Sequence, residues 1–178
     1  MIPILFEATE TAFDSNGIGR LTDATVCTVT EERNGSFELE MQYPATGSLY
    51  KELAMSRIIL AVPGDGRTSQ PFRIYKISRP INGIVTVSAQ HISYQLSYIP
   101  VMPFSPVSSA NAALMALKSN AAEDCPYTFW SDNTTAGIFS VTVPQSLRSS
   151  LGGQEGSVLD IYGGEYEWDR YMIRLHAA

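Results

Sequence analysis

The side chains able to act as nucleophile or base are few. The chain has two histidines and two cysteines, and His91 is the candidate general base, with Cys27 or Cys125 as its nucleophile. The same residues also fit a core role, in which both thiols are small buried apolar groups and His91 hydrogen-bonds a neighbouring backbone group. We favour the core role. We expect His176 to lie in a loose terminal tail. The four residues are scattered rather than paired at ligand spacing, so no zinc site is predicted.

Three carboxylates near the end of the chain share one spacing. Glu165, Glu167 and Asp169 occupy alternate positions of a predicted strand, so their side chains project from the same face. Such a row of acids either binds a hard cation or forms a solvated face opposite a buried face made by Tyr166 and Trp168. We favour the solvated face. A glycoside hydrolase would place its two catalytic acids on separate elements, and no such pair stands out in the sequence.

Two glycine-containing loops resemble ligand loops only weakly. Residues 152–157, Gly-Gly-Gln-Glu-Gly-Ser, lack the lysine of a phosphate loop and contain an acid. Residues 14–17, Asp-Ser-Asn-Gly, begin like a calcium loop but lack the later ligands at the required spacing. The sequence therefore predicts no catalytic, cofactor-binding or metal-binding residue.

The elements over residues 1–99 are predicted to be strands. Residues 36–43 alternate apolar and polar side chains, and Asn34-Gly35 before them favours a tight hairpin with residues 24–32. Further β-rich runs cover residues 56–62, 71–77 and 84–92, separated by glycine and proline turns. Short turns between such strands indicate a meander, so we predict a small β-barrel domain over 1–99.

Residues 100–178 are predicted to form an α+β domain, which makes the chain mainly β with an α+β portion. Pro100, Pro103 and Pro106 open this part as a linker, and a helix follows from Ser108 or Ser109 to Leu117. Short helices are predicted over 146–151 and 156–162. Residues 165–175 read as one long strand without a hairpin mate, so we expect this domain to be truncated at its C-terminal end.

Composition excludes several classes of protein. The 178 residues carry 12 basic and 18 acidic side chains, a net charge of −6, and 44% of them are hydrophobic, which is ample for a folded core. No apolar run is long enough to span a bilayer. No basic stripe is present either, so we expect no specific nucleic-acid binding.

Three stretches, in order, carry a family resemblance. They are the hairpin of residues 31–44, the run from Phe72 through residues 87–96, and the glycine-rich part from Leu151 through Gly163-Gly164 to residues 165–175. Together they resemble the N-terminal hub region of phage and prophage tail proteins. This is the minor structural, prophage endopeptidase tail or tail-associated lysin family, which is similar to the baseplate hub of contractile tails.

The resemblance implies a structural part rather than an enzyme. Hubs of this family assemble as trimers, dock on the distal tail protein below the tail tube, and line the channel through which the genome leaves. It thus implies a homotrimer in the full-length assembly and a place at the virion tail tip, reached through the cytoplasm of the bacterial host. It implies no cofactor, and any peptidoglycan hydrolase activity would lie in a missing C-terminal region.

Two alternatives remain open. One is a cell-wall hydrolase that uses His91 or the strand acids Glu165, Glu167 and Asp169. The other is a carbohydrate-binding module, suggested by Trp130, Trp168 and nine tyrosines, although such aromatics are more often part of a core.

Overall fold

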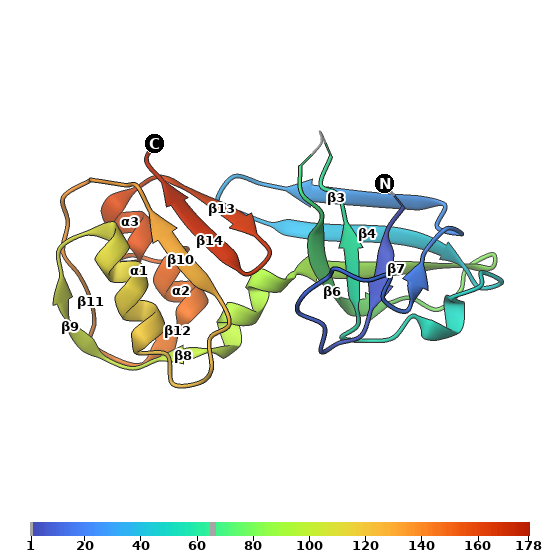
Figure 1. The fold of residues 1–178 in the computed structure, drawn as a ribbon, viewed down its shortest axis with the longest axis horizontal. Coiled ribbons are helices and arrows are strands. Elements are labelled where there is room, and N and C mark those ends of the chain that lie inside the picture. Colours follow the sequence, from blue (N-terminus) through green and yellow to red (C-terminus); the bar gives the residue numbers. More distant parts are fainter. Residues whose placement is uncertain (1, 65–66) are drawn as a thin grey trace. The chain divides into compact units, whose positions relative to one another are not determined.

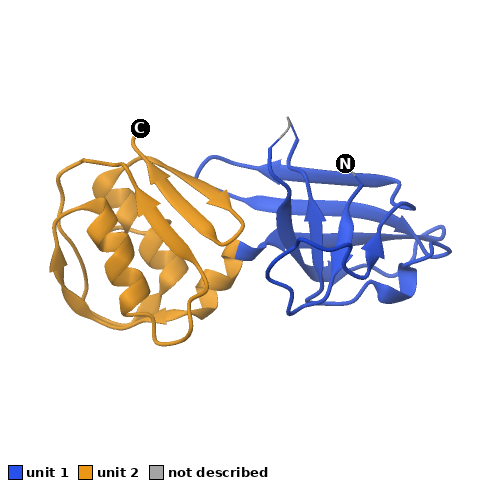
Figure 2. Cartoon of the chain, viewed as in Figure 1, with its two compact units in different colours: residues 1–92 blue, residues 93–178 orange. Residues whose placement is uncertain are grey.

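The computed structural model describes residues 2–64 and 67–178 (Figure 1). The chain forms two compact units, Met1–Ile92 and Ser93–Ala178 (Figure 2). The division falls between residues 92 and 93, whereas the sequence placed the domain boundary between 99 and 100. The segment between these positions is the 3-10 helix η2 (Ile92–Tyr98).

The first unit is built on a seven-stranded antiparallel sheet of order β2-β1-β5-β6-β7-β4-β3. At the hairpin of β3 and β4, Asn34 adopts a φ of 54°, the left-handed conformation that asparagine tolerates, as the Asn-Gly pair predicts. The alternating face of β4 is buried, with Phe37, Leu39 and Met41 at most 2% exposed. The elements are β1 (Ile4–Phe6), β2 (Gly19–Arg20), β3 (Val26–Glu31), β4 (Phe37–Pro44), the 3-10 helix η1 (Tyr50–Glu52), β5 (Ile58–Ala61), β6 (Gln70–Ile77) and β7 (Ile84–His91).

The first unit is β-rich as predicted, but its sheet does not close into a barrel. Its terminal strands are β2 and β3, and among the described residues neither pairs with the other. The physical reason is strand length. Strand β2 has two residues and β1 has three, so that end of the sheet offers too short an edge to pair with the six residues of β3. The sheet is therefore curled and open.

The second unit packs short helices against a three-stranded sheet of order β10-β14-β13, and Figure 1 shows the helices grouped beside β10 and β14. Serine begins each helix: the side chains of Ser109, Ser146 and Ser157 each accept a hydrogen bond from a backbone N–H of the first turn. The elements are β8 (Pro100–Val101), β9 (Phe104–Val107), α1 (Ala110–Ser119), β10 (Thr128–Ser131), β11 (Phe139–Val141), β12 (Gln145–Ser146), α2 (Leu147–Leu151), α3 (Val158–Tyr162), β13 (Glu165–Asp169) and β14 (Met172–His176).

The predicted single strand over 165–175 is wrong. The chain turns at Arg170-Tyr171, where Arg170 has a φ of 54°, and β13 and β14 pair as an antiparallel hairpin. Strand β14 also pairs in parallel with β10, so it lies in the middle of the sheet. The truncation was predicted from an unpaired strand; the two halves of that strand pair with each other, and β13 lies at the edge of the sheet.

The Gly163-Gly164 pair is required by the entry into this hairpin. Gly163 ends α3 with a φ of 66°, and Gly164 has a φ of 103°. A Cβ on Gly164 would lie 2.2 Å from the backbone oxygen of His176. Only glycine therefore allows the start of β13 to approach the end of β14 this closely.

Candidate functional site

His91 lies in the core of the first unit. Its side chain is fully buried, its ring stacks on Phe37 with centroids 4.6 Å apart, and its Nε2 lies 3.2 Å from Oε1 of Gln70. Phe72 packs against the ring from a second direction at 5.8 Å. These contacts fit the structural role preferred for His91 and leave it remote from solvent.

Neither cysteine forms a nucleophile pair with His91. Strand register places Cys27 opposite Met41 and Met41 opposite Val87, so Cys27 lies two strands and four residues from His91, roughly 16 Å away. Burial raises the pKa of Cys27 to about 11, which keeps the thiol protonated at neutral pH. Cys125 belongs to the second unit, and burial raises its pKa too.

The strand acids form an ion-paired outer face of the three-stranded sheet. Nη1 of Arg174 lies 3.0 Å from Oε1 of Glu167 and 3.6 Å from Oδ2 of Asp169. Glu165 and Glu167 are exposed, while Tyr166 and Trp168 are buried on the opposite face. Among the described residues, no group of three or more His, Cys, Asp or Glu side chains could hold a metal ion. The arrangement is that of a solvated face, and the cation-site alternative has no ligand cluster to support it.

His176 lies in strand β14, not in a loose tail as predicted. Its Nε2 lies 2.9 Å from Oε2 of Glu167, and its Nδ1 lies 3.5 Å from Oδ2 of Asp132. The hydrogen bond to Glu167 raises the pKa of His176, and the same bond lowers the pKa of Glu167. Both ring nitrogens thus face carboxylates rather than a hydroxyl or thiol, which is not the geometry of a base that activates a nucleophile.

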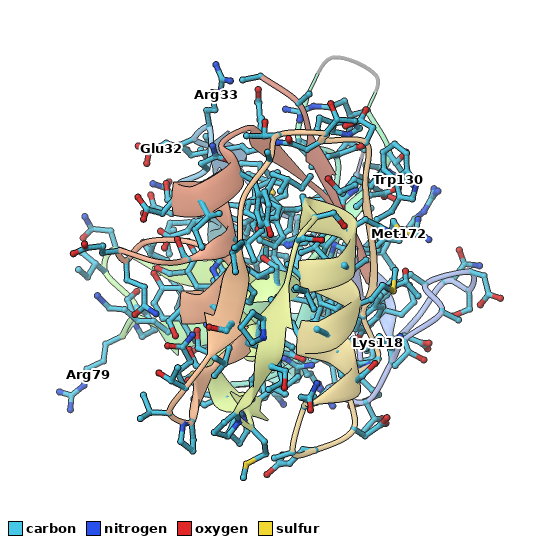
Figure 3. All side chains as sticks on the ribbon, turned by 90° about the vertical axis from the view of Figure 1, so that its left-hand side faces the viewer. Glu32, Arg33, Arg79, Lys118, Trp130 and Met172 are labelled. Atoms are coloured by element: carbon cyan, nitrogen blue, oxygen red, sulfur yellow. The ribbon has the colours of Figure 1, made fainter. Side chains whose placement is uncertain are left out.

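The two tryptophans differ in exposure. Trp168 is 8% exposed and belongs to the core, whereas Trp130 is 44% exposed. Figure 3 shows Trp130 and Met172 near one another at the surface, and the strand register places both on the outer face of the sheet. A carbohydrate-binding role therefore has the exposed ring of Trp130 to support it and not that of Trp168.

Arg148 is a residue that no sequence pattern singled out. It projects from the short helix α2, and its guanidinium lies 4.9 Å from the ring of Tyr94 and 4.5 Å from the ring of Trp168. Its Nη1 donates to Oγ of Ser93 at 3.1 Å. Burial lowers the pKa of Arg148. The side chain thus joins η2, α2 and β13 in one cluster, whose role is structural.

The two glycine-containing loops are turns. In residues 152–157, Gly156 N–H donates to Asp160 at 2.8 Å and the Ser157 side chain begins helix α3. In residues 14–17, Gly17 has a φ of 55°, and a Cβ there would lie 2.4 Å from the backbone oxygen of Leu5. Each loop is explained by local geometry without a ligand.

Strand β3, residues 26–31, lies at one edge of the sheet of the first unit, and Glu31 at its end pairs with Arg67. Among the described residues β3 pairs only with β4, so its other backbone edge is open. The strand is rich in β-branched residues, contains no lysine, arginine or proline, and has Glu31 at its end as its one charged side chain. Natural proteins usually blunt such edges with charge, proline or short length, and the two-residue β2 does so at the other end. An open edge of this kind is suited to pairing with another chain.

The whole chain has the fold of a known protein structure. The fold is similar to that of the crystal structure of prophage tail protein gp18 from Listeria monocytogenes EGD-e, with a TM-score of 0.66 and 14% sequence identity. The likeness covers 99% of this chain and 51% of that one, so the chain spans about half the length of its structural relative. A scan against family models finds no match, and a search of curated proteins finds none either.

Proposed function

We propose that this chain is a structural component of a phage or prophage tail. The observation that carries the proposal is the shared fold, since both compact units together align with a prophage tail protein over 99% of the chain. The described side chains support it, because His91 is buried in the core, burial raises the pKa of the Cys27 thiol, and Glu167 and Asp169 pair with Arg174. The proposal therefore assigns no catalytic residue to this chain.

The finer form of the proposal is a baseplate hub at the tail tip. In this role the chain joins the tail tube and the distal tail protein to the apparatus that contacts the host. The sequence resemblance in three ordered stretches supports this placement. A hub also lines the genome exit channel, and a net charge of −6 is compatible with a wall that repels DNA.

The assembly we propose is a homotrimer in which the β3 edge takes part. The open sheet leaves this edge available, and pairing it with a neighbouring chain would satisfy backbone groups that the open sheet leaves without a strand partner. The isolated chain then associates at high concentration, toward a mass three times 19.5 kDa.

Light scattering behind a sizing column, over a concentration series, tests this assembly. A lysine on an edge strand opposes edge-to-edge pairing, so Thr28→Lys should shift the mass toward the monomer. Ser88→Lys is the matched control, because register places Ser88 on the same face as Thr28 but in an interior strand. A wild-type chain that stays monomeric at every concentration, or a control that dissociates as readily as Thr28→Lys, would contradict a role for this edge.

No helix in the described part of the chain is long and apolar enough to cross a membrane. A place in the virion tail, reached through the cytoplasm of the bacterial host, is part of the same proposal.

A further inference from the structure

Three segments meet at His176. Strand β14 contributes the imidazole, β13 contributes Glu167, and the residue after β10 contributes Asp132. The Nε2 atom of His176 lies 2.9 Å from Glu167 Oε2, while Nδ1 lies 3.5 Å from Asp132 Oδ2. The two ring nitrogens are thus engaged by two different carboxylates on opposite sides of the ring.

This geometry depends on protonation. An ionised carboxylate accepts hydrogen bonds and donates none, and a neutral imidazole has one N–H, so it can donate to only one of the two acids. Its other nitrogen would then present a lone pair to the second carboxylate. The imidazolium form has an N–H on each nitrogen and can donate to both.

We propose that His176, Asp132 and Glu167 form a proton-operated tie that fastens the end of strand β14 in mildly acidic conditions and loosens it when the imidazole loses its proton. We name these three residues the His176 tie. The proposal goes beyond the structural role above, since it concerns a switch within the second unit.

The tie fastens backbone as well as side chains. Oδ1 of Asp132 accepts the backbone N–H of Ala177 at 3.0 Å, so the carboxylate that faces the imidazole also holds the next residue. The neighbouring Ser131 donates its hydroxyl to the backbone oxygen of Leu175 at 2.7 Å and does not titrate. Loss of the proton therefore acts first at residues 176 and 177 and leaves the rest of β14 paired.

The other charged groups on this face favour the cation. Glu165 stands directly opposite His176 in the strand register, which adds a third acid beside the ring. Arg174, two residues away on β14, is paired with Glu167 and Asp169. The uncharged ring of Trp130 packs against the imidazole in an edge-type contact with centroids 5.8 Å apart. The face around His176 thus holds more acids than bases.

The sign of the pH dependence follows. The pKa of His176 is raised above its ordinary value, chiefly by the hydrogen bond to Glu167 and then by Asp132. A group whose pKa is raised on folding stabilises the folded state at low pH and loses that effect as pH rises through the folded pKa. The tie is therefore closed below this raised pKa and opens as pH rises through it.

An NMR titration tests the tie in the full chain. The sequence has only two histidines, so the His176 signal is assigned by its disappearance in His176→Gln, and buried His91 is the internal reference. We expect both nitrogens of His176 to be protonated at pH 5 to 6, and a midpoint above that of a free histidine. Asp132→Asn and Glu167→Gln each remove one acceptor charge and should each lower that midpoint, Glu167→Gln by the larger amount because its hydrogen bond is the main cause of the raised pKa.

Amide exchange supplies the second readout. The amide of Ala177 should exchange slowly below the midpoint and faster above it, beyond the ordinary base-catalysed rise seen at an amide of the core strand β7. In Asp132→Asn this extra step should disappear. A His176 midpoint at or below the free value, or one unmoved by both substitutions, would overturn the proposal, as would Ala177 exchange that tracks the β7 reference throughout.

Discussion

The cluster around Arg148 gives the sharpest stability prediction. The guanidinium lies within 5 Å of two aromatic rings, Tyr94 and Trp168, and donates to Ser93. Each of the two partly desolvated cation–π contacts contributes about 1–2 kcal/mol, and a hydrogen bond from a charged group adds about 1.5 kcal/mol. Part of this sum offsets the cost of taking the charge out of water. We therefore expect Arg148→Ala to lower the free energy of unfolding by about 3 kcal/mol.

Two further substitutions separate charge from packing. Arg148→Met keeps an apolar stem between the rings and removes the charge, so it should lower the free energy of unfolding by about 1–2 kcal/mol. Glu155→Ala is the control, because Glu155 is an exposed charged side chain in the same unit as Arg148. A surface change of this kind should stay within about 0.5 kcal/mol of wild type.

Denaturant unfolding followed by tryptophan fluorescence measures the effect in the right unit. Both tryptophans, Trp130 and Trp168, belong to the second unit, so this signal reports its unfolding alone, while far-ultraviolet circular dichroism reports both units. Replacing a buried charge by an apolar side chain is often neutral or stabilising. An Arg148→Met chain as stable as wild type would therefore refute the argument that the stacked cation holds η2, α2 and β13 together.

Three further predictions follow from the same structure. Gly164→Ala should lower the thermal midpoint of the second unit by more than Gly153→Ala, since both glycines have positive φ but only at Gly164 does a Cβ meet backbone, at 2.2 Å; equal losses would argue against the close approach. The stability difference between wild type and His176→Gln should be greatest in mildly acidic solution, falling as pH drops through the lowered pKa of Glu167 and as it rises through the raised pKa of His176; a flat profile would contradict the ion pair. Cell-wall zymography should show no clearing with wild type, and clearing that is lost in His91→Ala or Glu167→Ala would establish the hydrolase alternative.

Local signals in the sequence predicted much of the fold. The Asn34-Gly35 turn, the alternation over residues 36–43 and the serine before α1 each act within a few residues, and each appears in the structure where it was expected. The turn at Arg170 was missed because it contains neither glycine nor asparagine. Its left-handed residue is stabilised by the pairing of β13 with β14, which no local pattern reveals.

The arrangement around the candidate site depended on contacts that are distant in sequence. Asp132 and His176 lie 44 positions apart, and Ser93 and Arg148 lie 55 apart, so neither pairing could be inferred from spacing. The closed barrel was predicted wrongly for a similar reason. Short turns between the strands suggested closure, but closure depends on how much of β1 and β2 pairs, and that depends on the path of residues 7–18, which form no strand.

The central claim is a structural place in a phage tail. Immunogold electron microscopy tests it most directly, with antibodies raised against the purified chain and applied to particles released after induction of the strain that encodes it. The account predicts gold at the tail tip of intact particles, and no gold on particles treated with antibody that was preabsorbed with the chain. Gold on the capsid, or particles that carry no label while the chain is found only in the soluble fraction of the lysate, would contradict it.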